Sequence, residues 1–518
     1  RPLSLRIILI AATSLPLTPV AAQHWLGLTP SNYAGVNAIF QQPAQVADSR
    51  YRLSVQVAGL DGYGYTNYVR WAAPYSMGRF GLGLVPPQFH DAQGDLRFGP
   101  GDLTERLNGR TKKAFGGGEI RGPGIVIASR DGRWGVGFTT RVRAGGGVVN
   151  TTEPLARLIR AGFPGSSALP LPTVTAQRST VNLGSYGELG LTLGYVVRTN
   201  DRHFWKVGAS VKRVVGLYNV HLAVRDASYQ LVPDPDLPGL TALAIQQASG
   251  SYGYTTEAAY KSPSGGWLLG KSAPGAGWGF DVGVVYEHRP DARQYRYIEN
   301  GEQRLDGSRN KYQYRVSASL TDLGVVQYKN PAYVTQYDQF SATNRSLTNT
   351  SFMFVQNADA FFGRVGDILG VESAQRQTAF RSVLPTALNL SVDYKIDENL
   401  YVNGTWVQPL LSPTTVGLYR PAVLAVAPRY ELPRAEVSLP VSWQGNYTNL
   451  TVGLAVRLGP VVLGTDHLPG LLNLGRPRGA NVYASLSVPM LRPSPRDPLA
   501  CYTPGTVQTV RKRGLFRR

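Results

Sequence analysis

ELGLTLGYVVRTNDRHFWKVGASVKRV, residues 188–214, is the stretch that decides the fold class of this chain. Apolar side chains occupy every second position from Leu189 to Val197, and small or polar side chains occupy most of the positions between them. After the polar turn TNDRH, Trp205 to Val211 alternate in the same way with Lys206 to Lys212. Because successive side chains of a strand point to opposite faces, this is a β-hairpin with one apolar and one polar face. The hairpin alone does not decide whether its apolar face lies on a protein core or on lipid.

The same alternation runs through the whole chain. Among 518 residues, 58 Gly and 28 Tyr stand against 3 Met and 1 Cys, which favours strands and turns over helices. Several strands are about ten residues long, which is the length of a tilted membrane strand and exceeds the usual length in soluble sheets. We therefore predict an all-β fold, a single antiparallel transmembrane β-barrel of about 14 strands, with 12 to 16 admissible. The clearest alternating segments are residues 51–57, 124–145, 278–290, 312–328, 388–409, 434–459 and 480–488.

The positions of aromatic residues and connections predict lipid outside the barrel and water inside. Tyr51, Trp134, Tyr195 and Trp205 are among the aromatic residues near strand ends, as an interfacial girdle requires. Short turns alternate with long connections, which we expect at residues 218–254 and 330–384. Outer-membrane barrels have this asymmetry.

The chain divides into three parts. Residues 1–23 have Arg1 and Arg6, an apolar run and a small-residue site, which together predict a cleaved secretory signal peptide. Residues 24–490 form the predicted barrel. Residues 491–518 are rich in Pro and end in a basic cluster, which is typical of a flexible tail. The expected location is the outer membrane of a Gram-negative cell.

Two insertions are expected to contain short helices. Residues 101–115 have acidic residues near their start and basic residues near their end, which suits a helix dipole. Residues 357–371 carry apolar side chains at helical spacing. Each insertion is a candidate to plug the lumen or to pack as a helix on a loop, with Leu103, Phe361 and Phe362 as the candidate residues.

No motif indicates catalysis. The six histidines have no metal-ligand spacing, and there is no nucleophile elbow or phosphate loop, so we expect no enzyme, no metal and no cofactor. The formal net charge is +20, with Lys and Arg spread through strands and turns. We expect anionic partners such as outer-membrane lipid and lipopolysaccharide, and protein partners through the loops or the basic tail, rather than nucleic acid.

The polar faces of the strands supply candidate lumen residues, namely Arg141, Arg143, Lys206 and Lys212. Cationic side chains around a lumen raise the local anion concentration, which favours a passive or gated conduit for small solutes, including anions. Two alternatives stay open. One is a closed barrel that serves as a docking or assembly subunit of a surface or secretion complex. The other is a soluble periplasmic β-protein.

Several segments together resemble a known family. They include QQPAQVADSRYRLSV from Gln41, GPGIVIASRDGRWGVGFTTRVRAG from Gly122, GWGFDVGVVYEHRP from Gly277 and LPTALNLSVDYKIDENLYVNGTWVQP from Leu384. The family is an uncharacterised group of outer-membrane β-barrels from Bacteroidota, similar in style to long-chain fatty-acid transporters and to barrel subunits of the type IX secretion apparatus. Gln42 departs from its usual Asn before proline. The resemblance implies a location and a fold, and no catalytic residues.

Overall fold

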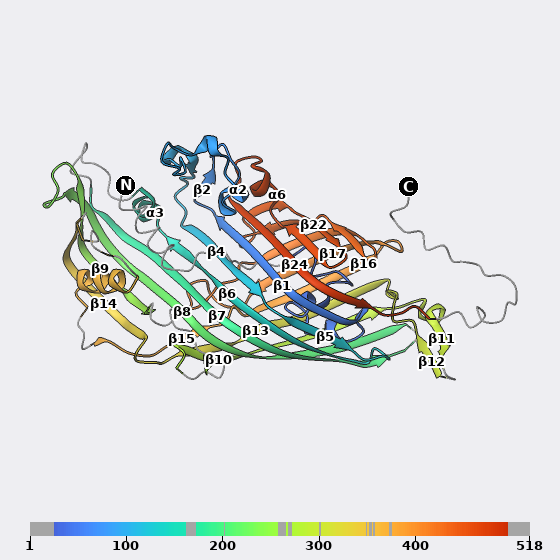
Figure 1. Ribbon diagram of the computed structural model, residues 1–518. Helices are drawn as coiled ribbons and strands as arrows, with labels where there is room; N and C mark the ends of the chain where they lie inside the picture. Colours follow the sequence, from blue (N-terminus) through green and yellow to red (C-terminus); the bar gives the residue numbers. More distant parts are fainter. Residues whose placement is uncertain are drawn as a thin grey trace.

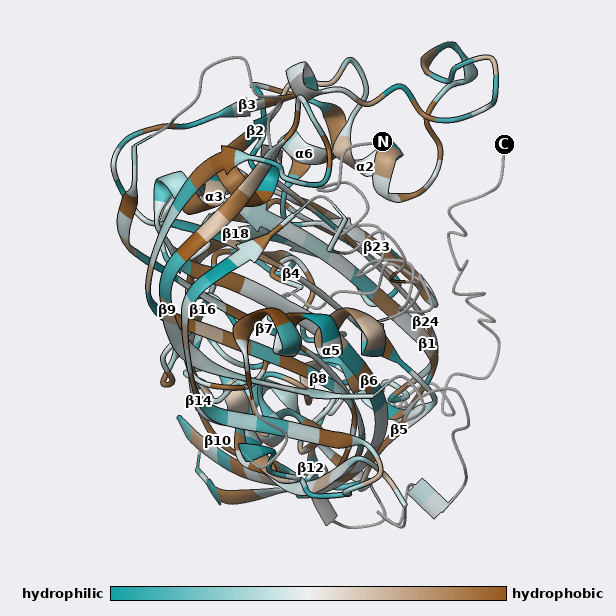
Figure 2. Cartoon of the chain, turned by 90° about the vertical axis from the view of Figure 1, so that its left-hand side faces the viewer, coloured by the Kyte–Doolittle hydropathy of each residue, from teal (hydrophilic) through white to brown (hydrophobic). Residues whose placement is uncertain are grey.

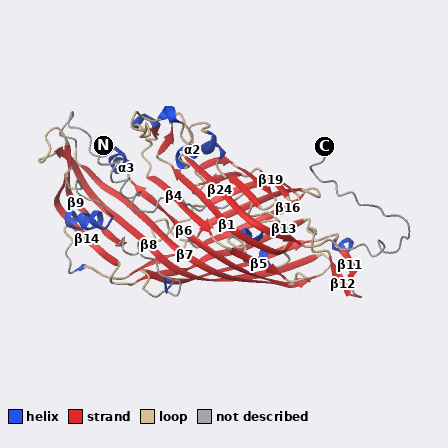
Figure 3. Ribbon diagram, viewed as in Figure 1, coloured by secondary structure: helices blue, strands red, loops and turns tan. Residues whose placement is uncertain are grey.

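In the computed structural model, the strands wind around a common axis that runs roughly horizontally in Figure 1. The structure describes residues 25–495, except 162–171, 201, 257–265, 268–271, 300–301, 349, 352–354, 356–357 and 372–374. The predicted signal peptide and nearly all of the predicted tail lie outside these residues. Strands make up almost the whole wall, whereas the helices are short and lie at its ends or on its loops (Figure 3).

The wall is a closed ring of 14 antiparallel strands, as predicted. Several strands are interrupted, so that one position in the ring combines two segments, for example β4 with β5 around Gly122 and Pro123. The ring closes where β1 pairs with β24, from Tyr51 opposite Leu491 to Tyr65 opposite Gly479. In ring order the segments are β1 (Tyr51–Thr66), β4 (Lys112–Arg121) with β5 (Gly124–Ala128), β6 (Trp134–Thr151), β7 (Val174–Thr199), β8 (His203–Pro233), β10 (Gly275–His288), β13 (Tyr314–Tyr328), β15 (Phe380–Val383) with β16 (Ala387–Lys395), β17 (Leu400–Pro409), β18 (Val423–Glu431), β19 (Ala435–Ser438) with β20 (Val441–Gln444), β21 (Asn449–Val452) with β22 (Leu454–Leu458), β23 (Val461–Thr465) and β24. β24 is Gly479–Leu491.

The faces of the strands are those that the alternation predicts. Leu191 and Leu193 are 62% and 60% exposed on the outside, whereas Lys206 and Lys212 are 3% and 5% exposed on the inside. Apolar side chains cover the outer wall in many other strands, among them Phe138, Phe280, Val392, Leu450 and Leu463. Brown and teal segments therefore alternate along the ribbons in Figure 2. A closed ring with an apolar outer surface satisfies its backbone hydrogen bonds internally, which is the condition for a wall that faces lipid.

One side of the wall continues beyond the ring. The upper half of β8 pairs with β9 (Thr241–Thr255), and β9 pairs with β14 (Val334–Leu347). α5 (Ala358–Leu369) packs on this extension, which lies at the left in Figure 1. The helix expected in residues 357–371 is confirmed. The long connections expected at 218–254 and 330–384 are wrong over much of their length, because the strand pattern continues there and is paired with neighbours.

A second projection lies above the ends of β1 and β24 (Figure 1). It contains β2 (Val69–Trp71), α2 (Met77–Gly81), β3 (Leu103–Glu105) and α6 (Leu468–Leu472), and we call it the outer loop subdomain. The helix expected in residues 101–115 is wrong: a 3-10 turn at Pro100–Asp102 leads into β3, and β4 begins at Lys112. β3 forms because residues 103–105 pair with β2, which a single-segment pattern does not reveal.

The two ends of the ring differ. One end has tight turns, at residues 129–133, 396–399 and 432–434, and we call it the short-turn end. The hairpin of β11 (Arg296–Glu299) and β12 (Glu302–Leu305) also lies there, at the right in Figure 1. Among the described residues, no helix has both the length and the apolar character needed to cross a membrane.

Candidate functional site in the plugged lumen

Residues 25–50 run through the inside of the ring and fill it, so we call them the plug. The plug has two short 3-10 turns, Gly35–Ala38 and Pro43–Val46, and most of its residues are buried. The wall approaches the plug so closely that a Cβ atom at Gly208 would overlap the backbone of Ala44, and one at Gly135 would overlap the carbonyl of Val46. Glycine in a strand interior marks such a close approach of another backbone.

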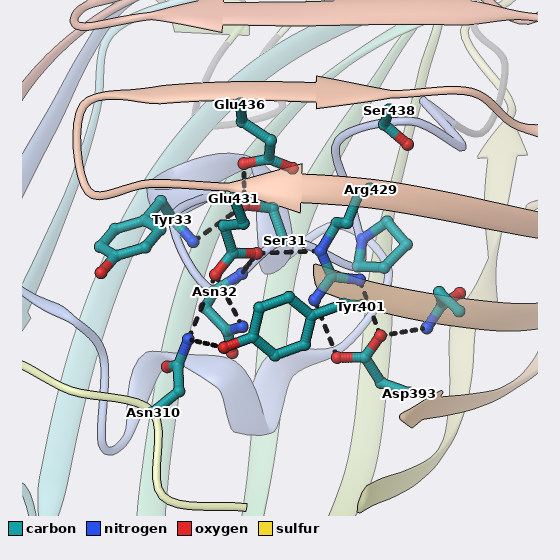
Figure 4. A network of polar contacts seen from close by, with 12 residues as sticks. Ser31, Asn32, Tyr33, Asn310, Asp393, Tyr401, Arg429, Glu431, Glu436 and Ser438 are labelled. Atoms are coloured by element: carbon teal, nitrogen blue, oxygen red, sulfur yellow. Dashed lines mark hydrogen bonds and ion pairs between the residues drawn. The ribbon is translucent and has the colours of Figure 1, made fainter. Parts of the chain in front are cut away.

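Carboxylates of the wall hold the middle of the plug (Figure 4). The Ser31 hydroxyl donates to Glu436 Oε2 at 2.6 Å. The backbone and side-chain nitrogens of Asn32 donate to the Glu431 carboxylate at 3.2 and 2.8 Å. Arg429 in turn donates to Glu431 Oε2 at 2.9 Å. All these groups are buried or nearly so, and most of their polar atoms are hydrogen-bonded to one another, although Glu436 Oε1 has no hydrogen-bond partner among the described residues.

The same asparagine also bonds to residues at the start of β13. Tyr312 and Arg315 donate to Asn32 Oδ1 at 3.0 and 2.9 Å. Asn32 therefore ties the plug to two nearby parts of the wall, one around β13 and one around β18, which two strand positions separate in the ring.

The start of the plug is anchored on β1, β24 and the loop before α6. The Trp25 indole donates to Asp61 Oδ2 at 2.9 Å and stacks on Tyr483, with ring centroids 4.9 Å apart. The Leu26 amide donates to Asp466 Oδ2 at 3.2 Å. Burial of Asp466, in the loop between β23 and α6, raises its pKa to about 7 despite these hydrogen bonds.

Three of the four predicted lumen residues meet in one cluster of ion pairs. Arg141 lies 2.6 Å from Glu188, and Arg143 lies 2.8 Å from Asp322. Lys212 also reaches Asp322, at 2.5 Å. We call this cluster the lumen ion network; its members are Glu119, Arg121, Arg141, Arg143, Glu188, Lys212, Asp281 and Asp322. Every cation in it contacts at least one carboxylate, and cations and carboxylates are equal in number.

The fourth predicted lumen residue, Lys206, binds the plug. Its ammonium donates to the Ala47 carbonyl at 3.0 Å. Asn37 and Phe40 of the plug and the lumen ion network line an internal cavity of about 60 Å³. A space of this size holds a few water molecules, so the lumen is closed at this level in the described conformation.

The end of the plug reaches the short-turn end. Asp48 lies 2.7 Å from Arg50 and 2.5 Å from Arg289. Burial raises the pKa of Asp48, but these two guanidinium groups outweigh it and hold the pKa well below its usual range.

The helix candidates from the sequence lie elsewhere. Leu103 begins β3 and packs with Trp71 in the outer loop subdomain. Phe361 and Phe362 are in α5, where the Phe362 ring stacks on Tyr254 of β9 at 5.0 Å. Neither region supplies the segment that fills the lumen. Sequence reasoning missed the plug, although glycines at matching heights on the polar faces of β6, β7 and β8 were a signal for a backbone inside the ring.

The sequence of this chain matches a known protein family. The model of a family of unknown function, DUF5723, matches residues 43–466. This chain belongs to DUF5723. The matched range begins within the plug and includes the wall from β1 to β23, so this DUF5723 member carries the end of its plug inside the family's common region. No curated protein is similar enough in sequence to match the chain.

Some solved structures are distantly similar to this DUF5723 protein. The toluene transporter TbuX of Ralstonia pickettii shares 11% identity at a TM-score of 0.34, covering 89% of this chain and 95% of the transporter. The Pseudomonas putida toluene transporter TodX shares 8% identity at a TM-score of 0.27, covering 88% and 94%. The outer-membrane protease OmpT of Escherichia coli shares 8% identity at 0.21, covering 85% and 96%. These values carry over no residue and no activity.

Proposed function

We propose that this protein is a gated conduit for small solutes in the outer membrane of a Gram-negative cell, with residues 25–50 as the gate. The observation that carries the proposal is a closed, outwardly apolar ring whose lumen is filled by the chain's own plug through polar contacts. Hydrogen bonds of this kind exchange with water at a modest net cost, so the polar contacts of the plug can rearrange. The buried apolar side chains of the plug, such as Leu28, Val36 and Ile39, oppose this movement and favour the closed position.

The lumen ion network bears on the choice of solute. A ring of cations attracts anions only where its charge is not already balanced. Arg141, Arg143 and Lys212 each contact carboxylates within the network. We therefore infer that the network positions the plug and the wall, and that any preference for anions is set outside the network.

Export and the surrounding surfaces belong to the same proposal. The signal peptide at residues 1–23 brings the chain to the outer membrane, where lipid and lipopolysaccharide contact the apolar outer face. The basic tail at residues 491–518 is available to protein partners.

A disulfide between plug and wall tests the gate. A Cβ atom at Gly194 would lie 3.5 Å from the Cβ of Ala47, which suits a disulfide. The test protein carries Ala47→Cys and Gly194→Cys, together with Cys501→Ser, and Val46→Ala because the Val46 side chain lies 2.5 Å from the new atom. Single-channel current across a planar bilayer is expected to be blocked after oxidation and to return after reduction.

The matched control places the disulfide within the wall. Thr192 and Ser210 lie opposite each other on β7 and β8, with their hydroxyls 2.7 Å apart. Thr192→Cys with Ser210→Cys, in the same Cys501→Ser and Val46→Ala background, leaves the plug free to move. A current that is insensitive to oxidation in the plug-locked protein would refute the gate.

A second candidate function is a permanently closed barrel that docks other proteins. The outer loop subdomain favours it, because Leu82 and Leu84 are 57% and 66% exposed there and Phe80 is 44% exposed. Exposed apolar side chains that are adjacent in sequence are typical of contact surfaces. A folded, reduced protein that carries no current under any applied voltage would favour this alternative over the conduit.

A further inference from the structure

A cavity of about 710 Å³ opens at the short-turn end, where the plug leaves the ring. The β5–β6 turn, the β11–β12 hairpin, the segment between β12 and β13 and the residue after β24 all contribute to its lining. We call it the basic vestibule, because its lining includes Arg130, Arg133, Arg289, Lys311 and Arg492.

The acidic residues of the basic vestibule do not balance these charges. Among the side chains that the structure describes, two carboxylates line the vestibule, Asp48 and Asp131. Asp48 is held by Arg289 and by Arg50, at 2.5 and 2.7 Å. Asp131 accepts the Ser129 hydroxyl at 2.5 Å and reaches the Arg133 guanidinium only at 4.0 Å. The Arg130 side chain contacts no carboxylate among the described residues.

The two most enclosed of the remaining cations are bound by neutral groups. Lys311 is 5% exposed and donates to the carbonyls of Asp306 and Arg309, at 2.5 and 3.0 Å. Arg492 is 8% exposed and donates to three backbone carbonyls at distances between 2.7 and 2.9 Å. Carbonyls satisfy the hydrogen bonds of these groups but supply no negative charge to neutralise a cation. A positive charge held in a cavity in this way is arranged for an anion.

The state of Lys311 agrees with this geometry. Burial lowers its pKa well below the usual range, and repulsion from Arg50 adds to the effect. An anion in the basic vestibule opposes both influences, because it supplies the missing negative charge. Binding is therefore expected to raise the pKa of Lys311.

The remaining lining indicates what kind of anion fits. Several guanidinium groups lie around one space, and their planar donors match the oxygens of phosphate. Val196, Phe204 and Leu305 add apolar surface beside them. We propose that the basic vestibule binds a phosphate-bearing molecule, carried either as a soluble phosphate ester or as a lipid headgroup. Its capture as cargo rests on the proposed conduit function, whereas the binding itself does not.

Calorimetric titration of the detergent-solubilised protein with inorganic pyrophosphate tests the site. Arg130→Gln with Arg133→Gln removes two turn cations that hold no other element in place, and is expected to weaken binding at least about tenfold. Arg110→Gln with Arg434→Gln is the matched control, since it removes the same charge at exposed positions outside the vestibule lining. It is expected to change affinity less than about twofold.

Proton uptake gives a second readout. Titrations in two buffers of different ionisation enthalpy measure the protons exchanged on binding, and the wild type is expected to take up more protons than Lys311→Gln. Absence of pyrophosphate binding in the folded wild type, or an equal loss of affinity in the control variant, would overturn the site. An equal loss would mean that the attraction comes from the net charge of +20 rather than from this cavity.

Two further probes separate the sources of the phosphoryl group. Comparable affinity for glycerol 3-phosphate and dihexanoyl phosphatidic acid would assign a soluble ester. Preference for the short-chain lipid, lost again in the Arg130→Gln/Arg133→Gln variant, would assign a headgroup. Because these titrations require no current, a protein that binds and does not conduct refutes the conduit alone, and one that conducts and does not bind refutes the vestibule alone.

Discussion

The lumen ion network and the basic vestibule contain the same types of cationic residue, but the cations have different partners in the two regions. In the network, Arg141 and Lys212 reach carboxylates at 2.6 and 2.5 Å, and neither is more than 5% exposed. In the vestibule, Lys311 and Arg492 are enclosed almost as fully and are bound by carbonyls. In the network, the cations are neutralised by carboxylates of the wall and stabilise the structure. In the vestibule, Lys311 and Arg492 lack carboxylate partners among the described residues and are available to a ligand. Whether cations are paired with carboxylates, rather than whether cations are present, therefore distinguishes a structural region from a binding region.

The largest effect is expected from breaking the network at Asp322. This carboxylate contacts Arg143, Arg141 and Lys212, so Asp322→Asn leaves three buried cations short of negative charge. The free energy of unfolding should fall by about 3–5 kcal/mol, as for other broken buried pairs. Urea unfolding of the refolded protein measures this, with Asp131→Asn at the exposed turn as the control. A cost below about 1 kcal/mol would contradict the structural role of the network.

A pH effect on stability should follow from the buried carboxyl group that anchors the start of the plug. The pKa of Asp466 is about 7, above its ordinary value of 3.8, so the folded state holds a proton that the unfolded state has lost between about pH 4 and pH 7. Stability from this group is therefore complete below about pH 4 and falls as pH rises, by about 1.4 kcal/mol per pH unit. The difference in unfolding free energy between the wild type and Asp466→Asn should follow this slope. A difference that is constant with pH would place the titration elsewhere.

A smaller effect on the closed position of the plug is expected from removing the Asn32 side chain. Asn32→Ala removes the side-chain bonds to Glu431, Tyr312 and Arg315. Because these bonds involve charged groups, the closed position should lose about 2 kcal/mol, and the frequency of open events in single-channel records should rise about 30-fold. Asn67→Ala, whose side chain bonds within the exposed loops, is the control. Unchanged opening in Asn32→Ala would mean that the plug is not the gate.

The smallest effect on stability is expected in the vestibule. Arg492→Gln loses hydrogen bonds to carbonyls but also relieves repulsion between neighbouring cations, so the unfolding free energy should change by about 1 kcal/mol or less. The same urea titration measures it beside Asp322→Asn. A loss as large as that of Asp322→Asn would remove the distinction between the two regions.

Much of the wall could be predicted from sequence. The alternation in residues 188–214 gave the correct faces of β7 and β8, because a period of two is a local property of each strand. The approximate number of strands followed from counting such segments. The extension by β9 and β14 was missed, since its pattern is weaker and it forms by pairing between residues far apart in the chain.

The site was less accessible to prediction. Arg141, Arg143 and Lys212 were correctly assigned to an inward-facing polar surface, but their carboxylate partners lie on other strands; Asp322 is 179 residues from Arg143. Ser31 and Glu436, which fix the plug, are 405 residues apart. A single sequence records such distant contacts only indirectly, through the small size of Gly135 and Gly208, where another backbone passes.

The position of the plug immediately before β1 also sets the order in which the protein assembles. The ring is completed by pairing β1 with β24, and Leu26 bonds to Asp466 across 440 residues of chain. The plug must therefore lie at the axis when β24 pairs with β1, because afterwards the wall surrounds it. Gly208 of the wall packs against the backbone of Ala44 only when the plug is in this position. The plug thus acts as a template around which the strands of the barrel assemble. Because the closing contacts join residues far apart in the chain, folding is expected to be slow.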